Sequence, residues 1–241
     1  MMKYVNILFF TIMIVMNYLA NALPLNNKTT GELSDSFPNL FVPAGITFSI
    51  WGIIYLLLLI YSIMQFTSSD KITIYNISWF FAISCLFNAL WIIAWHYGKL
   101  PMSLIIMSGL LISLIYINMA ISHLPMGIIK AAFGVYLGWI CIATIANVAA
   151  LLVSYSWNGF GISQEAWTII MISIGTIIAV LSLYRLNNPF IGLVVIWAFI
   201  GIIIKRSDDF RWIVITAAAG ILVVGIVTAL GFFRTNYQKN C

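Results

Sequence analysis

The chain has 241 residues, of which 63% are hydrophobic and only 7% are charged, whereas an ordinary soluble domain has about 25% charged residues. This composition excludes a water-soluble fold and predicts an all-α polytopic membrane protein. The formal net charge is +5, but the basic residues stand singly at the ends of apolar segments. We therefore interpret them as topology signals and expect no nucleic-acid partner. The three cysteines show no close pairing, which argues against a disulfide or a metal site.

Eight apolar segments follow one another along the chain, and each is close to the roughly 20 residues that cross a bilayer as a helix. Most breaks between them are short, so consecutive helices should be antiparallel. In front of the seventh segment, Asn188 and Pro189 are the residue types expected for a helix cap and a first helical position. The segments expected to be helical are 4–22, 45–66, 76–97, 101–122, 130–154, 167–184, 189–204 and 212–233.

Two polar stretches interrupt this regular pattern. Residues 23–44 are polar, and near their end Pro43 has the fixed φ that suits the opening turn of the second helix. Residues 154–165 form a longer polar break between five helices and three. We therefore divide the chain into a five-helix transmembrane domain at 1–157 and a three-helix extension at 158–241.

The ends of the predicted helices bear on processing and orientation. Ala20-Asn21-Ala22 imitates a signal-peptidase site, but we expect the first helix to be retained, because the segments that follow do not need a cleaved leader. Eight crossings put both termini on one side, which holds six Lys or Arg residues against five on the other. We expect a multi-pass protein of a prokaryotic cell membrane with both termini in the cytoplasm.

Three of the predicted helices carry aromatic or amide residues at helical spacing, so that each set occupies one face. One interpretation is that these residues form interfacial belts and the core of the bundle. The other is that the three faces line a flat, mostly apolar pocket, because an amide as deep as Asn88 needs a partner across helices or in a cavity. The three sets are Trp51 and Tyr55; Asn88, Trp91 and Trp95; and Tyr136, Trp139, Ala143 and Asn147.

Gly134 and Gly138 lie on the opposite side of the fifth helix from its aromatic face. A small-x-x-x-small pair of this kind allows the close approach of another helix or of another protomer. We therefore expect tight packing on this face, and we consider a homodimer built on it.

The sequence contains no catalytic signature. The motifs H-E-x-x-H, G-x-x-x-x-G-K-[ST] and G-x-S-x-G are absent, so we assign no catalytic and no metal-binding residue. No predicted helix centre carries Asp, Glu, Lys or Arg, which argues against energised transport. His96, at the end of the third helix, is either a polar residue at the interface, which we favour, or an axial ligand to a tetrapyrrole metal or a proton acceptor.

Three blocks of the sequence resemble the TspO/MBR family, the tryptophan-rich sensory proteins that include the translocator protein. The first is the proline-containing loop at 38–43, which leads into Trp51-Gly52-Ile53-Ile54-Tyr55. The second runs from Asn88-Ala89-Leu90-Trp91 to Trp95 and His96. The third is Tyr136-Leu137-Gly138-Trp139, followed by Ala143, Thr144 and Asn147. The blocks stand in the family's order and spacing and cover about residues 1–157.

The resemblance implies a five-helix bundle in which the first loop covers a pocket for porphyrins, sterols or similar ligands, often in a dimer. The expected partners are membrane lipid and a hydrophobic small molecule such as a bound protoporphyrin or haem-like tetrapyrrole, with no covalent cofactor. The residues expected to bind the ligand are Pro43, Trp51, Tyr55, Asn88, Trp91, Trp95, Tyr136, Trp139, Ala143 and Asn147.

Three functional hypotheses follow from the aromatic faces and the resemblance. The first is a TspO-like membrane protein that binds a hydrophobic planar ligand for sensing or regulation. The second is a small-molecule transporter or exporter, in which the last three helices move against the first five. The third is an enzyme that degrades a bound porphyrin, with the tryptophans taking part in the chemistry.

Overall fold

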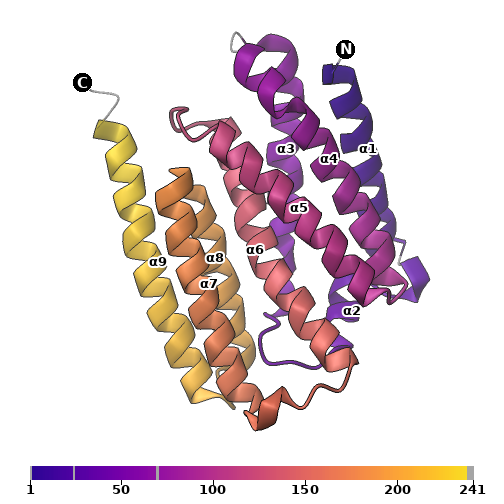
Figure 1. Cartoon of the computed structure of the whole chain (residues 1–241), viewed down its shortest axis with the longest axis vertical. Coiled ribbons are helices and arrows are strands. Elements are labelled where there is room, and N and C mark those ends of the chain that lie inside the picture. Colours follow the sequence, from indigo (N-terminus) through magenta and orange to yellow (C-terminus); the bar gives the residue numbers. More distant parts are fainter. Residues whose placement is uncertain (1, 24, 69–70, 238–241) are drawn as a thin grey trace.

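The computed structural model describes residues 2–23, 25–68 and 71–237, and within these ranges it is helical without any strand (Figure 1). Each of the predicted long helices is present. They are α1 (Met2–Asn21), α3 (Ile50–Thr67), α4 (Lys71–His96), α5 (Leu100–Ala120), α6 (Ile128–Ser154), α7 (Gln164–Leu186), α8 (Phe190–Arg206) and α9 (Arg211–Tyr237). Shorter elements are η1 (Leu25–Asn27), α2 (Thr30–Asp35), η2 (Gly45–Ser49) and η3 (Gly159–Gly161).

Seven helical segments of the described chain are long and apolar enough to cross a membrane. The other long helix, α8, has 17 residues, which at 1.5 Å per residue gives about 25 Å and places it at the short limit of a membrane span. It runs alongside its neighbours (Figure 1). The predicted all-α polytopic membrane fold is therefore confirmed.

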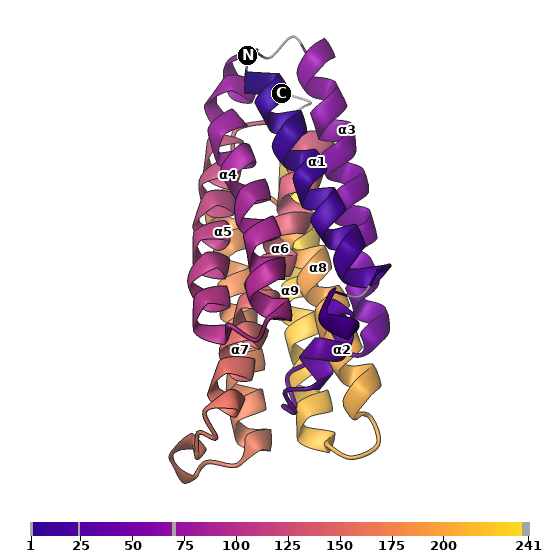
Figure 2. The ribbon, with the colours of Figure 1, turned by 90° about the vertical axis from the view of Figure 1, so that its right-hand side faces the viewer.

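The bundle has two distinct ends. Figure 2 shows that α1 begins and α9 ends at the same end, which we call the terminal end. The short helix α2 lies at the opposite end, which we call the loop end (Figure 1). The first loop, residues 22–44, returns the chain from α1 to α3 at this loop end.

The central helix of the bundle is α6. It packs against α3 and α5 on one side and against α7 and α8 on the other, and most of its residues are buried. α1, α3, α4 and α5 complete a five-helix unit with α6, while α7, α8 and α9 pack against one another beside it (Figure 1). These are the two groups that the polar break at 154–165 separates in the sequence.

The helix boundaries differ from the sequence-based expectation at two prolines. Pro43 does not open an α-helix, because it lies before η2, a 3-10 helix that precedes α3. The residue after it, Ala44, is turned towards α8, where its N–H donates to the Gly201 carbonyl oxygen at 3.0 Å. Pro189, predicted as the first helical position, is instead the N-cap of α8, and Asn188 precedes it, with its Oδ1 accepting from the Phe190 N–H at 3.3 Å, so the helix begins one residue later than expected.

The small-residue face of α6 is covered by α8. A Cβ atom added at Gly138 would come within 2.7 Å of the Ile191 carbonyl oxygen, and one added at Gly134 would collide with the Asn188 side chain. The close approach predicted for this face is therefore present, and it is made to a helix of the same chain. Within this chain α8 occupies the face on which a homodimer through Gly134 and Gly138 was considered, and the dimer itself stays a prediction.

A polar cluster at the terminal end joins the five-helix unit to α7 and α8. Buried Lys130, in the first turn of α6, donates from Nζ to the carbonyl oxygens of Ser122 at 2.9 Å and Asn187 at 2.8 Å. These carbonyls follow the C-termini of α5 and α7, where the helix dipole favours a cation. Asn188 Nδ2 donates to Asn118 Oδ1 at 2.8 Å and to the Lys130 carbonyl oxygen at 2.9 Å. We call these five residues the polar joint.

A second buried network links three helices inside the five-helix unit. Asn88 on α4 accepts from Asn17 Nδ2 on α1 at 2.7 Å and donates to the Tyr136 hydroxyl on α6 at 2.9 Å. All three side chains are buried. Because lipid supplies no hydrogen bonds at this depth, the network satisfies the Asn88 amide and holds α1, α4 and α6 together.

Candidate functional site

A cavity with aromatic walls lies at the loop end, between α3, α4, α6 and the first loop. Its volume is about 40 Å³, which is comparable to one or two water molecules. We call it the aromatic cavity. It is lined by Thr30, Ser34, Pro43, Phe48, Trp51, Trp91, Trp95, Trp139, Ile142, Ala143, Ala146 and Asn147.

The rings of the cavity wall fix one another's orientation. Trp91 and Trp95, one turn apart on α4, are stacked with their centroids 5.6 Å apart. Trp139 meets Trp51 edge to face at 6.2 Å and Phe48 edge to face at 5.6 Å. Each such pair is worth about 0.5–1.5 kcal/mol beyond its buried area. The walls therefore present ordered aromatic surfaces.

Four N–H donors in this wall lack a partner. Nε1 of Trp91, Trp95 and Trp139 and Nδ2 of Asn147 form no hydrogen bond with the described residues, although all four side chains are buried. The other end of the Asn147 amide is bonded, since its Oδ1 accepts from Ser103 Oγ at 3.0 Å. A buried polar group without a partner costs about 1–3 kcal/mol. Residues of the cavity wall thus carry hydrogen-bonding capacity that the described residues do not use.

The structure brings seven of the ten predicted residues to the cavity and leaves three outside it. Asn88 and Tyr136 belong to the interhelix network, and Tyr55 stacks on Trp51 with the ring centroids 5.5 Å apart. All three lie about one helical turn further from the loop end than their neighbours in the wall, because α3 begins at that end while α4 and α6 finish there. The seven residues in the wall are Pro43, Trp51, Trp91, Trp95, Trp139, Ala143 and Asn147.

Five further residues of the wall were not predicted. Ile142 and Ala146 follow Trp139 by three and seven positions, so a strict helical periodicity on α6 could have found them. Thr30 and Ser34 come from α2, and Phe48 comes from η2. These three reach the cavity only because the first loop folds back over it, and no local pattern in the sequence indicates that path.

The first loop is fastened to the end of α4 by buried His96. Its Nδ1 lies 3.0 Å from the Leu25 carbonyl oxygen, and its Nε2 lies 3.1 Å from Thr30 Oγ1. Because a carbonyl oxygen only accepts, Nδ1 carries a proton, and in the neutral ring Nε2 accepts from the hydroxyl. Both ring nitrogens are therefore engaged, which supports a structural role over metal ligation. No group of three metal-binding side chains occurs in the described part of the chain.

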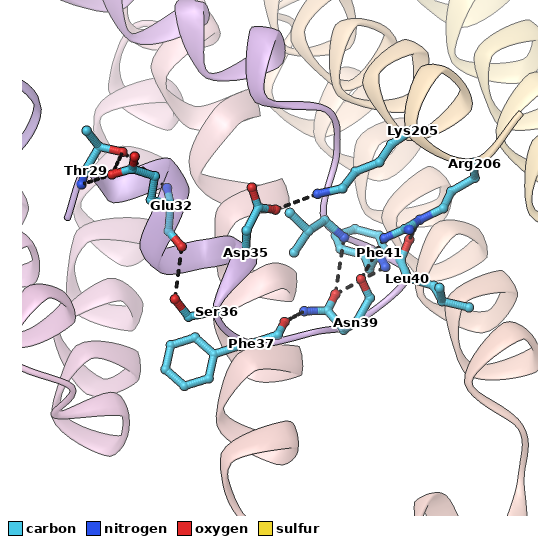
Figure 3. Close-up of polar contacts among 11 residues, drawn as sticks. Thr29, Glu32, Asp35, Ser36, Phe37, Asn39, Leu40, Phe41, Lys205 and Arg206 are labelled. Carbon is cyan, nitrogen blue, oxygen red and sulfur yellow. Dashed lines mark hydrogen bonds and ion pairs between the residues drawn. The ribbon is translucent and has the colours of Figure 1, made fainter.

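The N-terminus of α2 is closed by a capping box (Figure 3). Glu32 N donates to Thr29 Oγ1 at 3.2 Å, and Glu32 Oε2 accepts from Thr29 N at 2.7 Å. The hydrogen bonds from the Thr29 backbone and side chain lower the pKa of the Glu32 carboxyl group. This cap sets the start of the short helix that carries Thr30 and Ser34 to the cavity.

Two larger cavities lie beside the first loop. One, of about 340 Å³, is bounded by Pro38, the end of α6 and the start of α7. The other, of about 230 Å³, lies between the first loop and the end of α8. Ser34 lines both this second space and the aromatic cavity. Residues 34–43 of the first loop therefore separate the small aromatic cavity from a larger space.

The chain was compared with known proteins. A family model described as TSPO-like protein matches residues 3–230. No match was found among curated proteins or among solved structures. The matched range goes beyond residues 1–157, which carry the resemblance in the sequence, and continues through α7 and α8 into α9. With its long apolar helices the chain is a multi-pass integral membrane protein, and it belongs to the TSPO-like protein family.

Proposed function

We propose that this protein binds a flat, largely apolar small molecule in the aromatic cavity and that binding serves sensing or regulation. The observation that supports this proposal is the set of buried donors of Trp91, Trp95, Trp139 and Asn147, which line one cavity and have no partner among the described residues. Because the wall offers donors, the ligand should present hydrogen-bond acceptors, such as carbonyl or carboxylate oxygens or ring nitrogens.

Two free-energy terms favour such a ligand. Its apolar faces gain about 25 cal/mol for each Å² removed from water. In addition, an acceptor that reaches one of the unpartnered N–H groups removes a cost of about 1–3 kcal/mol. A flat hydrocarbon of the same area gains only the first term, so we expect the protein to discriminate by about tenfold for each hydrogen bond recovered.

A protoporphyrin or haem-like tetrapyrrole matches this site in chemistry but not in size. Its flat ring suits the indole faces, and its carboxylates are acceptors for the unpartnered donors. The aromatic cavity, however, measures about 40 Å³, far below the roughly 300–1,000 Å³ of sites for drug-sized ligands. A tetrapyrrole does not fit the cavity in this conformation. Its binding would require the first loop to move into the neighbouring space of about 230 Å³.

Export and porphyrin degradation stay hypotheses, since no contact among the described residues favours either. The spanning helices carry their Lys, Arg, Asp and Glu residues only near their ends, whereas ion-coupled transport usually uses an ionisable residue near the middle of the membrane. The residues that line the aromatic cavity include no carboxylate, lysine or histidine to act as a general base.

The test measures the binding of two flat probes to purified protein in lipid nanodiscs, with empty nanodiscs as the blank. Protoporphyrin IX carries acceptors, and perylene is a flat hydrocarbon without any. We expect saturable binding of protoporphyrin and at least about tenfold weaker binding of perylene. Absence of saturable binding of the protoporphyrin probe, or equal affinity for both probes, would contradict the proposal.

A substitution of Trp139 tests whether protoporphyrin binds in the aromatic cavity. Trp139→Phe removes the indole N–H but keeps an aromatic ring, so we expect about five- to tenfold weaker protoporphyrin binding. The matched control is Trp212→Phe on α9, whose side chain is 63% exposed and is not part of the cavity wall. Its affinity should equal that of the wild type. An unchanged affinity in Trp139→Phe would place the ligand elsewhere.

A further inference from the structure

A row of contacts fastens the first loop and η2 to α8. The contacting residues of α8 are spaced by four positions, so they lie on one face of this helix. The contacts are Trp197 Nε1 to the Thr47 carbonyl oxygen at 2.9 Å, Ala44 N to the Gly201 carbonyl oxygen at 3.0 Å, and Lys205 Nζ to Asp35 Oδ1 at 2.6 Å.

Arg206, the last residue of α8, bonds directly to the backbone of the first loop (Figure 3). Its Nη2 donates to the Asn39 carbonyl oxygen at 2.8 Å, and its Nε donates to the Leu40 carbonyl oxygen at 3.1 Å. Hydrogen bonds from a guanidinium are among the stronger ones in proteins. The neighbouring pair of Lys205 and Asp35 has side chains that are 27% and 57% exposed, so solvent weakens it. Arg206 therefore makes the main contribution at this end of the loop.

The loop also lies directly against the backbone of α8. A Cβ atom added at Gly201 would collide with Thr47 and Pro43. Pro43 in turn lines the aromatic cavity. The contact is therefore continuous from α8 through Pro43 to the cavity wall, so movement of the loop away from α8 would change the cavity itself.

We propose that α8 is a latch for the first loop and that the three C-terminal helices thereby set how fast a ligand enters the aromatic cavity. The proposal rests on the proposed function. Residues 34–43 separate the aromatic cavity from the space of about 230 Å³ that Lys205 and Arg206 also line. Release of the loop by these two residues lets residues 34–43 move away from α8 and opens the small cavity to larger molecules.

The latch has a kinetic signature because its contacts are made to the loop and not to the ligand. A bound tetrapyrrole requires the loop to move, so these contacts stabilise the closed loop of the ligand-free protein only. Weakening them raises the open fraction of the free protein, so the association rate increases and Kd decreases by about the same factor. A wall residue such as Trp139 differs, because its loss raises Kd, mainly through the dissociation rate.

The first experiment compares Arg206→Met with Arg211→Met by stopped-flow mixing with protoporphyrin IX. Arg211 is an exposed arginine at the start of α9 and lies at the same end of the bundle. In Arg206→Met we expect the association rate constant to rise about tenfold or more and Kd to fall by a similar factor, while the dissociation rate constant changes little. In Arg211→Met the rates should equal those of the wild type. Unchanged rates in Arg206→Met would overturn the latch.

A covalent cross-link between the first loop and α8 tests the latch in the opposite direction, because it holds the loop closed. Asp35→Cys and Lys205→Cys are combined with Cys241→Ser, while Cys85 and Cys141 are buried, and the new pair is bridged with a thiol-cleavable bifunctional reagent. We expect ligand exchange to stop in the bridged protein and to resume after reduction. Exchange at an unchanged rate through a bridged loop would contradict the proposal.

A measurement without ligand separates failure of the latch from failure of the proposed function. Hydrogen–deuterium exchange of residues 34–47 reports opening of the loop directly, and the Ala44 amide bonded to Gly201 is one reporter. Arg206→Met should speed this exchange about tenfold relative to the wild type and Arg211→Met. If neither probe binds but exchange accelerates, the proposed function fails and the latch stands. If exchange is unchanged, the latch is wrong.

Discussion

The polar joint and the aromatic cavity use buried polar groups in opposite ways. In the polar joint, the donors of Lys130 and Asn188 meet carbonyl and amide acceptors of the same chain. In the aromatic cavity, three indole N–H groups and one amide find no acceptor among the described residues. Since a polar group surrounded by apolar helices needs a partner, the joint is satisfied within the chain, whereas we propose that a ligand supplies the missing acceptors in the cavity. The difference separates polar residues that hold helices together from those whose hydrogen-bonding capacity the described residues do not use.

The largest expected effect is on the polar joint. Lys130→Met keeps the length of the side chain but removes the ammonium group, which leaves the Ser122 and Asn187 carbonyls without their donor. We expect the free energy of unfolding in detergent micelles to fall by about 3 kcal/mol. The measurement is a denaturant titration followed by circular dichroism.

The control for this variant is Lys71→Met, which removes an exposed lysine at the start of α4, at the same end of the bundle. Its unfolding free energy should stay within about 0.5 kcal/mol of the wild type. If Lys130→Met were as stable as Lys71→Met, the polar joint would not be what holds α7 and α8 to the five-helix unit.

Two asparagines sharpen the comparison. Each belongs to one of the three predicted sets of aromatic and amide residues, but the two lie in different surroundings. Asn88→Leu removes the bonds to Asn17 and Tyr136, so stability should fall by about 1 kcal/mol while the affinity for protoporphyrin IX stays unchanged. Asn147→Leu removes a donor of the cavity wall, so affinity should fall about five- to tenfold with a smaller loss of stability.

Both quantities are measured on both variants, which makes each the control of the other. Reversal of the pattern, with Asn88→Leu losing affinity and Asn147→Leu keeping it, would show that the ligand binds one turn deeper than the aromatic cavity. Equal effects of the two variants on both quantities would remove the distinction between the two kinds of polar residue.

The smallest expected effect concerns pH. The hydrogen bonds from Thr29 lower the pKa of Glu32, so the folded cap binds a proton less readily than the unfolded loop does. Its contribution is present above the ordinary carboxyl pKa and is lost as the pH falls through the lowered pKa. After correction for intrinsic exchange, acidification should reduce hydrogen-exchange protection in α2, whereas the polar joint, which has no carboxylate, should be unaffected. Protection in Glu32→Gln should not depend on pH over this range.

The helices of this protein could be predicted from its sequence because their signals are local. Apolar runs give the spans, turn residues give the breaks, and Asn188 marks the start of α8. The aromatic and amide residues at helical spacing also indicate which face of a helix points inwards. They do not give depth along the helix axis, and this is why Asn88 and Tyr136 were grouped with Trp91 and Trp139 although they bond to each other outside the cavity.

The path of the first loop could not be predicted, because it depends on partners far away in the sequence. His96 meets Thr30 across 66 positions, and Arg206 meets Asn39 across 167. The spacing of Trp197, Gly201 and Lys205 on one face of α8 is visible in the sequence, but nothing local shows that this face meets the loop. For the same reason the sequence could not show what covers Gly134, and in the structure the Asn188 side chain, which precedes α8, covers it.

The most direct test of the cavity's role observes its donors themselves. In a nitrogen-15 and proton correlation spectrum of tryptophan-labelled protein, the indole N–H signals of Trp91, Trp95 and Trp139 should shift saturably downfield as protoporphyrin IX is added. The indoles of Trp167 and Trp197 already donate to carbonyl oxygens and should move much less. If the three cavity signals stay in place at ligand saturation, or move no more than those of Trp167 and Trp197, the donors do not recognise the ligand and the proposed function is wrong.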